Sequence, residues 1–263
     1  MEINKIYNED CLVTLGRMED KSIDVILTSP PYNKSRASNN ERALANMEVH
    51  YKGFDDAKSN TEYIEWTLAR FKEFGRVLTD NGVVAYNLSY ATDEMRMSEL
   101  MWLVVAEVIK QGIFTLADTI VWKKKSAVPN NVSANKLTRI CEFIFIFVKR
   151  QSFDTFHANK RVLSVSKTGQ KIYEPFYNFI AAENNDGACE IHKATYSTSM
   201  CVQVLDRYGI RGGLVYDPFM GTGTTAIAAI ESGMKYIGSE ISKEYCDYAE
   251  KRIKLRISEP KMF

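Results

Sequence analysis

Short apolar runs alternate along the chain with longer segments in which apolar residues recur every three or four positions. Runs of the first kind predict buried strands, and segments of the second kind predict amphipathic helices. Strands are expected at 23–28, 83–86, 119–122, 141–148, 214–216 and 236–238, and helices at 59–78, 95–111, 197–208, 224–231 and up to about 257. This alternation favours an α/β fold, a mixed and mostly parallel sheet with helices on both faces.

Two segments interrupt the alternation. Residues 151–186 have weak periodicity and many polar side chains, and the stretch 33–58 is also polar. We therefore expect residues 1–150 and 187–263 to form one domain. Residues 151–186 are expected to be a small insertion in it.

Composition narrows the function classes. The 34 basic and 33 acidic residues leave a net charge of +1, which excludes a uniformly basic nucleic-acid coat protein. Five scattered cysteines without a Cys-x-x-Cys pair, and three histidines without ligand spacing, argue against a disulfide framework and against a metal site. Neither a signal peptide nor an apolar run of about 18 residues is found, so we expect a cytoplasmic protein without a membrane segment.

A glycine-containing turn follows the predicted strand 214–216. Its sequence is Asp-Pro-Phe-Met-Gly-Thr-Gly, from Asp217 to Gly223, and a helix, a strand and Glu240 come after it. Glycines let the backbone approach a ligand, and the acid at the next strand end can accept hydrogen bonds from ribose hydroxyls. The unit predicts a nucleoside-containing cofactor, although Gly-x-Gly alone is a weak signal and Ala226 stands where a dinucleotide fingerprint has its third glycine.

The strand 23–28 ends in a second unusual loop, Ser29-Pro30-Pro31-Tyr32. The two prolines remove backbone donors and stiffen the chain, so nearby carbonyl groups remain free to accept hydrogen bonds. Rigid acceptors beside an aromatic ring indicate a receptor for a planar amine.

Both loops resemble motifs of the DNA amino-methyltransferases. Ser29 to Tyr32 is similar to their motif of Asp, Asn or Ser followed by Pro-Pro and an aromatic residue, and Phe219 to Gly223 is similar to Phe-x-Gly-x-Gly. Segments 8–11, 141–144 and 192–197 resemble further family segments in the same order. The catalytic loop precedes the cofactor loop, as in the circularly permuted beta group. The resemblance implies a Rossmann-like methyltransferase fold and S-adenosylmethionine as cofactor.

The resemblance also implies a role for each matching residue. The Ser29 hydroxyl and the Pro30 carbonyl would accept the two amino hydrogens of the target base, Pro31 would complete the rigid loop, and Tyr32 would stack on a base flipped out of duplex DNA. The implied cofactor-binding residues are Asp10, Asp217, Phe219, Gly221, Gly223, Thr224, Glu240 and Ile241. For Asp10 and Asp217, a turn cap is an equally good interpretation of the local sequence.

Positive charge is concentrated in one part of the chain. Eleven Lys and Arg residues stand against two acids between residues 123 and 171, which indicates a DNA-facing segment, although a solvated surface is the alternative for any one lysine. The expected DNA-binding residues are Lys123, Lys124, Lys125, Arg139, Lys160 and Arg161. Residues 151–186 would recognise the target sequence, with the loop 33–58 as a further contributor.

Several alternatives stay open. Serine before the proline pair is more typical of cytosine-N4 enzymes of the family, but its chemistry also allows adenine N6. A nicotinamide oxidoreductase would leave the Pro-Pro loop unexplained, and an inactive nucleic-acid-binding homologue would lose a motif residue. A prokaryotic or phage origin, a cognate restriction endonuclease and a homodimer fit the resemblance, but the sequence alone decides none of them.

Overall fold

An eight-stranded sheet forms the centre of the protein. The computed structural model describes residues 1–33, 58–90, 92–93, 96–97, 99–127, 129, 131, 134–135, 137–187 and 196–258. The strand order is β1-β12-β11-β2-β3-β7-β6-β10. The strands are β1 (Lys5–Tyr7), β2 (Ile23–Thr28), β3 (Leu78–Leu88), β6 (Phe114–Lys124), β7 (Cys141–Lys149), β10 (Phe179–Ala182), β11 (Leu214–Asp217) and β12 (Lys235–Ser239). Only β7 runs antiparallel to its neighbours, which confirms a mixed, mostly parallel sheet.

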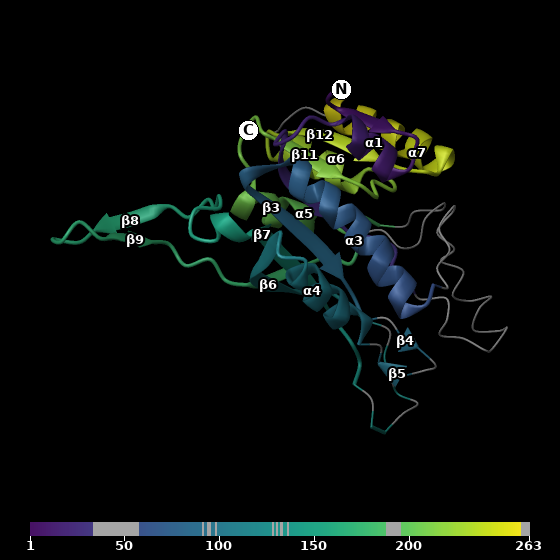
Figure 1. Cartoon of the computed structure of the whole chain (residues 1–263), viewed down its shortest axis with the longest axis horizontal. Helices are drawn as coiled ribbons and strands as arrows, with labels where there is room; N and C mark the ends of the chain where they lie inside the picture. Colours follow the sequence, from purple (N-terminus) through teal and green to yellow (C-terminus); the bar gives the residue numbers. More distant parts are fainter. Residues whose placement is uncertain are drawn as a thin grey trace.

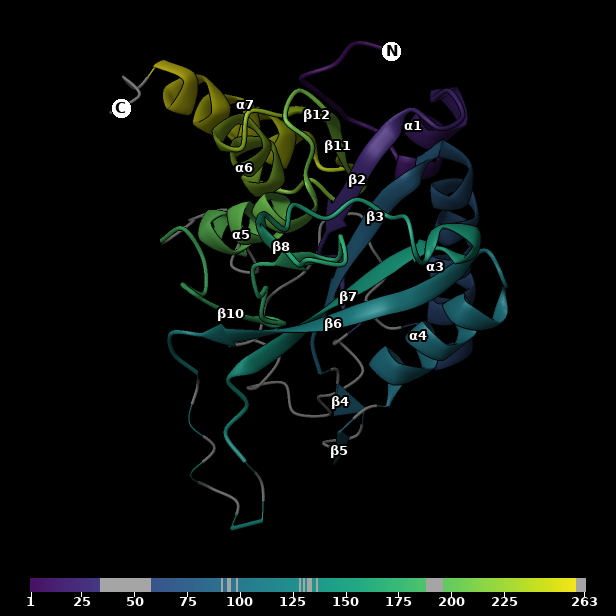
Figure 2. The same cartoon turned by 90° about the vertical axis from the view of Figure 1, so that its left-hand side faces the viewer.

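Helices cover both faces of this sheet, as predicted (Figure 2). They are α1 (Cys11–Arg17), α3 (Asn60–Val77), α4 (Leu100–Lys110), α5 (Thr198–Tyr208), α6 (Thr224–Glu231) and α7 (Lys243–Ser258). Side chains of α1, α3 and α4 pack with Ile26 of β2 in one apolar cluster, whereas α5, α6 and α7 pack with Val25 and Leu27 in the other. A strand with apolar residues at successive positions is therefore buried on both sides.

Local signals account for most helix boundaries. Ser59 and Glu62 form the capping box predicted by their spacing: the Ser59 hydroxyl accepts from the Glu62 N–H, and the Glu62 carboxylate accepts from the Ser59 N–H. One boundary differs from the prediction. Helix α4 begins at Leu100 and not at Met95, because the short strands β4 (Thr92–Asp93) and β5 (Arg96–Met97) form an antiparallel pair before it.

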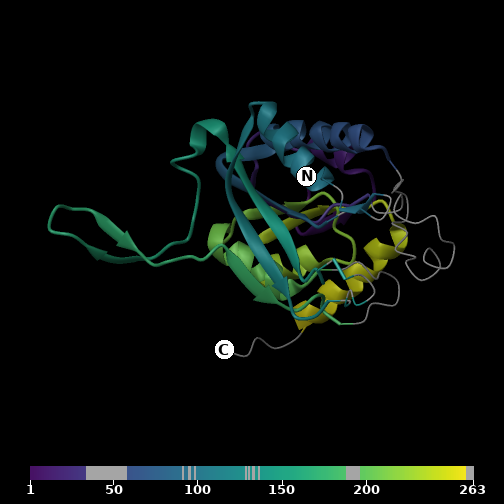
Figure 3. The same ribbon diagram turned by 90° about the horizontal axis from the view of Figure 1, so that it is seen from below.

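The predicted insertion 151–186 consists of two different parts. After the short 3-10 helix η2 (Arg150–Ser152), strands β8 (Val162–Val165) and β9 (Lys171–Tyr173) form a hairpin that projects from the body, and we call it the arm (Figures 1 and 3). Strand β10, by contrast, belongs to the main sheet, where it pairs with β6. The predicted insertion therefore includes one strand of the main sheet. Of the polar loop 33–58, residues 34–57 lie outside the described part of the chain.

No helix among the described residues is both long and apolar enough to span a membrane.

Candidate active site

The two loops singled out in the sequence lie next to each other. Strands β2 and β11 are parallel neighbours, with Val25 beside Val215 and Ile26 beside Tyr216. The carboxyl ends of neighbouring parallel strands lie at the same edge of a sheet. Ser29 follows β2 directly and Asp217 is the last residue of β11, so both residues lie at this edge. The Thr28 hydroxyl donates to Asp217 Oδ1 at 2.6 Å and so connects the two loops directly.

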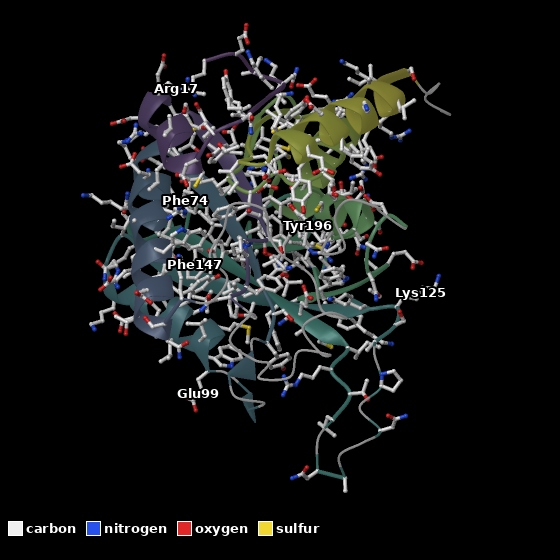
Figure 4. All side chains as sticks on the ribbon, turned by 90° about the vertical axis from the view of Figure 1, so that its right-hand side faces the viewer. Arg17, Phe74, Glu99, Lys125, Phe147 and Tyr196 are labelled. Atoms are coloured by element: carbon white, nitrogen blue, oxygen red, sulfur yellow. The ribbon has the colours of Figure 1, made fainter. Side chains whose placement is uncertain are left out.

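Asp217 is the centre of a buried polar cluster. Its Oδ1 accepts from the Thr28 hydroxyl and the Phe219 N–H, and its Oδ2 accepts from the Tyr196 and Thr225 hydroxyls. Tyr196 lies inside the molecule, between the sheet and its helices (Figure 4). Burial raises the pKa of the Asp217 carboxyl group, because burial disfavours the charged form. The four hydrogen-bond donors stabilise the carboxylate and so offset part of this rise in pKa. The side chain has no exposed surface, and the cofactor contact that the resemblance implies for it stays a prediction.

The cofactor turn has a backbone that favours glycine at two positions. Gly221 has φ 52° and Gly223 has φ 86°, both in the left-handed region. Gly223 is also the N-cap of α6, and a Cβ there would lie 3.0 Å from the Ala249 Cβ. The next residue, Thr224, opens the helix and is buried. The turn therefore brings bare backbone and a helix N-terminus to the edge of the sheet.

Glu240 follows β12 directly and completes this site. Its Oε2 accepts from the Gly221 N–H at 2.9 Å and its Oε1 from the Ser242 N–H at 2.8 Å. Burial raises the pKa of the Glu240 carboxyl group. Each carboxylate oxygen keeps a second lone pair, so the held carboxylate suits the two hydroxyls of a ribose. Ile241, which the resemblance implies to be a cofactor-binding residue, follows it and is 43% exposed.

An aromatic stack supports the cofactor turn from α3. Trp66 stacks on Phe219 with ring centroids 5.3 Å apart, and the Arg70 guanidinium lies 3.8 Å from the Trp66 ring centroid. Arg70 in turn pairs with Asp10, whose carboxylate also caps α1 by accepting from the Leu12 N–H. Asp10 thus has the capping position that the local sequence allowed. Trp66 lies in the predicted helix 59–78, and the sequence analysis did not assign it to the site.

The catalytic loop is held by its own aromatic residue and by α3. The Tyr63 hydroxyl donates to the Pro31 carbonyl at 2.6 Å, which engages that acceptor. Ser29 is half-buried, and its Oγ lies 2.7 Å from the Tyr32 hydroxyl. Tyr32 is only 8% exposed, so the predicted stacking of a base on its ring would need ring surface that is covered here.

Two residues that the sequence analysis did not assign to the site complete it. Asn87 at the end of β3 lies with its Nδ2 2.6 Å from the Tyr32 hydroxyl and 2.9 Å from Glu142 Oε2. Glu142 on β7 also accepts from the Tyr32 hydroxyl at 3.1 Å, and its other oxygen forms an ion pair with Lys124. One signal was available for Glu142, because it is the only acid in the apolar run 141–148.

The predicted DNA-binding residues divide into two groups. Lys123, Lys124, Lys125 and Arg139 lie around the end of β6 and the start of β7, at the carboxyl edge of β2 and β3. Lys125 points outward at the margin of the molecule (Figure 4). It pairs with Glu183, and Arg139 lies over the Tyr90 ring.

Lys160 and Arg161 belong to the arm, which starts from the opposite edge. Strand β7 ends there, and the His157 N–H donates to the carbonyl of Asn81, near the start of β3. Arg161 is paired with Glu174. The root of the arm thus lies at the edge of the sheet opposite to the Ser29 loop. Recognition of DNA by residues 151–186 stays a prediction. Within the described ranges, no group of three metal-ligating side chains is found.

Comparisons with known proteins show the family of this chain. Residues 23–251 match the family described as DNA methylase. The type II methyltransferase M.BglII of Bacillus subtilis is 28% identical over 265 residues, which cover 94% of this chain and 68% of that protein.

Two solved structures share the fold. The cytosine-N4-specific PvuII DNA methyltransferase has a TM-score of 0.74 and 17% identity, over 100% of this chain and 89% of its own. The M1.HpyAVI structure, a complex with SAM, has a TM-score of 0.61 and 21% identity, over 95% and 98%. The chain therefore belongs to the DNA methylase family and is an S-adenosylmethionine-dependent DNA methyltransferase that modifies an exocyclic amine, cytosine N4 or adenine N6.

Proposed function

We propose that the protein methylates the N4 amine of cytosine at a specific site in duplex DNA. The observation that carries this proposal is the position of Ser29. Its neutral hydroxyl lies at the end of β2, directly after Thr28, whose side chain is hydrogen-bonded to Asp217 at the start of the cofactor loop. Adenine N6 is the alternative, because a hydroxyl can accept a hydrogen bond from either amine.

Methyl transfer requires the catalytic loop to hold the amine of the target base in one orientation. The lone pair of an exocyclic amine is delocalised into its ring, and two acceptors on the amino hydrogens favour a geometry in which that lone pair is free. Ser29 Oγ and the Pro30 carbonyl are the proposed acceptors. The neighbouring Pro31 carbonyl already accepts from Tyr63 and so anchors the loop to α3.

The cofactor side is proposed to use the turn and the strand end described above. Glu240 would hold the ribose hydroxyls, Ile241 would flank the adenine, and the backbone from Phe219 to Gly223 would accommodate the rest, with Thr224 opening the helix behind it. Bound S-adenosylmethionine supplies a methyl group on a positively charged sulfur. Asp217 has a supporting part in this proposal, because it connects Thr28 to the turn.

DNA is proposed to bind over the carboxyl edge of the sheet. Lys123, Lys125 and Arg139 gather there and would contact phosphates on either side of the flipped base. A cognate restriction endonuclease would cut the same sequence, so methylation by this protein should protect DNA from it.

The identity of the modified base decides between the two amines. Purified protein is incubated with duplex DNA and methyl-labelled cofactor, and the nucleosides are analysed by mass spectrometry. We expect N4-methylcytosine. N6-methyladenine would support the alternative and refute the cytosine assignment, and no labelled nucleoside would refute both.

A pair of serine variants tests the loop. Ser29→Ala should lower the single-turnover rate about 100-fold, by analogy with the loss of one oriented hydrogen-bonding group in other active sites. Ser22→Ala is the matched control, because Ser22 precedes the opposite end of β2 and its hydroxyl donates to the Glu19 carbonyl. It should stay within about twofold of the wild type, since surface changes are usually small. Equal rates for all three proteins would exclude Ser29 as an acceptor.

A further inference from the structure

Behind the catalytic serine lies a chain of polar groups that ends in a carboxylate. Ser29 Oγ is 2.7 Å from the Tyr32 hydroxyl, and that hydroxyl is 3.1 Å from Glu142 Oε2. Asn87 Nδ2 lies within hydrogen-bond distance of all three groups. Asn87 and Glu142 are buried, at 0% and 6% exposure. Buried polar groups are usually hydrogen-bonded, so the direction of each hydrogen in this chain matters.

The carboxylate decides the direction of the hydrogens in this chain. A carboxylate accepts hydrogen bonds and cannot donate them, so the Tyr32 O–H must point to Glu142. The Tyr32 oxygen then faces Ser29 with a lone pair, and the Ser29 O–H must point to Tyr32. The reverse direction would leave two acceptor oxygens facing each other at 3.1 Å.

The contacts of Asn87 are consistent with this direction of the hydroxyl hydrogens. Its Nδ2 carries two hydrogens, and its two shortest contacts are Tyr32 at 2.6 Å and Glu142 at 2.9 Å. The contact to Ser29 Oγ is the longest at 3.3 Å, so it is the one left without a hydrogen. The lone pairs of Ser29 Oγ therefore remain unused by these three neighbours.

We propose that Glu142 is a positioning residue that turns the Ser29 hydroxyl into an acceptor for the amino group of the target base. The inference rests on the proposed role of Ser29 and extends it. Lys124 pairs with Oε1 and leaves Oε2 for Tyr32 and Asn87, so the ion pair orients the carboxylate. Two hydrogen bonds, from Ser29 to Tyr32 and from Tyr32 to Glu142, thus fix the Ser29 oxygen as an acceptor. An aspartate at this position would be an acceptor without such help.

The substitution Glu142→Gln tests this direction without removing volume. Lys124 would hold the amide oxygen of the glutamine, so its NH2 group would face Tyr32 and donate to it. The Tyr32 O–H could then turn to Ser29 Oγ and occupy a lone pair there. We expect the single-turnover rate to fall about 10- to 100-fold, while the dissociation constants for S-adenosylmethionine and DNA stay within about twofold.

The matched control is Glu231→Gln, which neutralises a carboxylate at the C-terminal end of α6 that is paired with Arg256 of α7. It should leave the rate unchanged. Thermal unfolding of both variants monitors the fold. A Glu142→Gln enzyme with the wild-type rate, or one whose rate loss is matched by an equal loss of cofactor or DNA binding, would overturn the inference.

A double-mutant cycle separates positioning from a general structural effect. Tyr32→Phe removes the hydroxyl through which Glu142 acts, so it should itself lower the rate. The variant carrying both substitutions should then be no more than about threefold slower than Tyr32→Phe alone. Multiplied losses in the double variant, or a Tyr32→Phe enzyme with full activity, would contradict the proposed path. Failure of the wild type to methylate DNA would instead refute the proposed function.

Discussion

The catalytic edge of the sheet and the projecting arm are built in opposite ways. At the catalytic edge, the polar side chains of Asp217, Asn87 and Glu142 are buried and bonded to one another or to neighbouring loops. On the arm, apolar side chains such as Val165 and Ile172 are exposed, at 60% and 50%. Residue type alone therefore does not decide burial in this protein. Polar groups are held inside where strands bring partners together, and apolar groups lie outside where a two-stranded hairpin has no second layer.

The largest expected effect comes from the same substitution made in both regions. Ile26→Ala in β2 should lower the free energy of unfolding by about 2–5 kcal/mol, because a fully buried side chain leaves a cavity. Ile172→Ala in the arm should change it by no more than about 0.5 kcal/mol. Denaturant unfolding of both variants measures the contrast. A large loss for Ile172→Ala would mean that the arm is packed against something in solution.

A second prediction concerns pH. Because burial raises the folded-state pKa of Asp217, its favourable contribution is complete below the unfolded-state pKa and is lost as the pH rises through the folded value. The Asp217→Asn variant should therefore gain stability relative to the wild type as the pH rises, by about 1.4 kcal/mol for each unit between the two pKa values. Unfolding measured from acid to neutral pH tests this.

Asp80 provides the control of opposite sign. The hydrogen bond from Lys21 lowers the pKa of this exposed carboxyl group, so its contribution is present above the unfolded-state pKa and lost as the pH falls through the folded value. Asp80→Asn should therefore lose stability relative to the wild type as the pH rises. The same slope for both variants would show that burial of Asp217 does not control the pH dependence.

The third prediction tests the support of the cofactor turn. Trp66→Ala removes the ring stacked on Phe219, and an aromatic pair contributes about 0.5–1.5 kcal/mol. Calorimetric titration with S-adenosylmethionine should show about three- to tenfold weaker binding. Trp102→Ala, which removes a 48% exposed ring from α4, should leave the affinity unchanged. Equal affinities for both variants would exclude a role for Trp66 in the turn.

The smallest effect is expected from single lysines. Lys123→Ala at the carboxyl edge should lower the salt dependence of DNA binding by about 0.9 on a double-logarithmic plot, the value for one phosphate contact. Lys167→Ala, in the turn of the arm, should leave the slope unchanged, because the arm starts from the opposite edge. The reverse result would place DNA on the arm and support the predicted recognition role of residues 151–186.

The site itself divides into a local part and a long-range part. The capping box at Ser59, the glycines of the cofactor turn and the Pro-Pro loop could all be predicted, because each depends on residues a few positions apart. The network of Asn87 with Tyr32 and Glu142 could not, since each bond joins residues 55 positions apart. Lys124 illustrates the limit: its charge predicted a DNA contact, and the fold pairs it with Glu142.

Apolar periodicity and turn chemistry act over short distances, so the order of amino acids was enough to predict the class of fold, the family and the two loops. Three features became visible only in the folded chain: β2 and β11 are neighbours, the Asp217 side chain is buried at the end of β11, and residues 151–186 contain the arm and one strand of the main sheet. Strand order sets which side chains meet, and it depends on how all strands and helices pack together. A carboxylate and a serine far apart in the chain thus become parts of one hydrogen-bonded path only after folding.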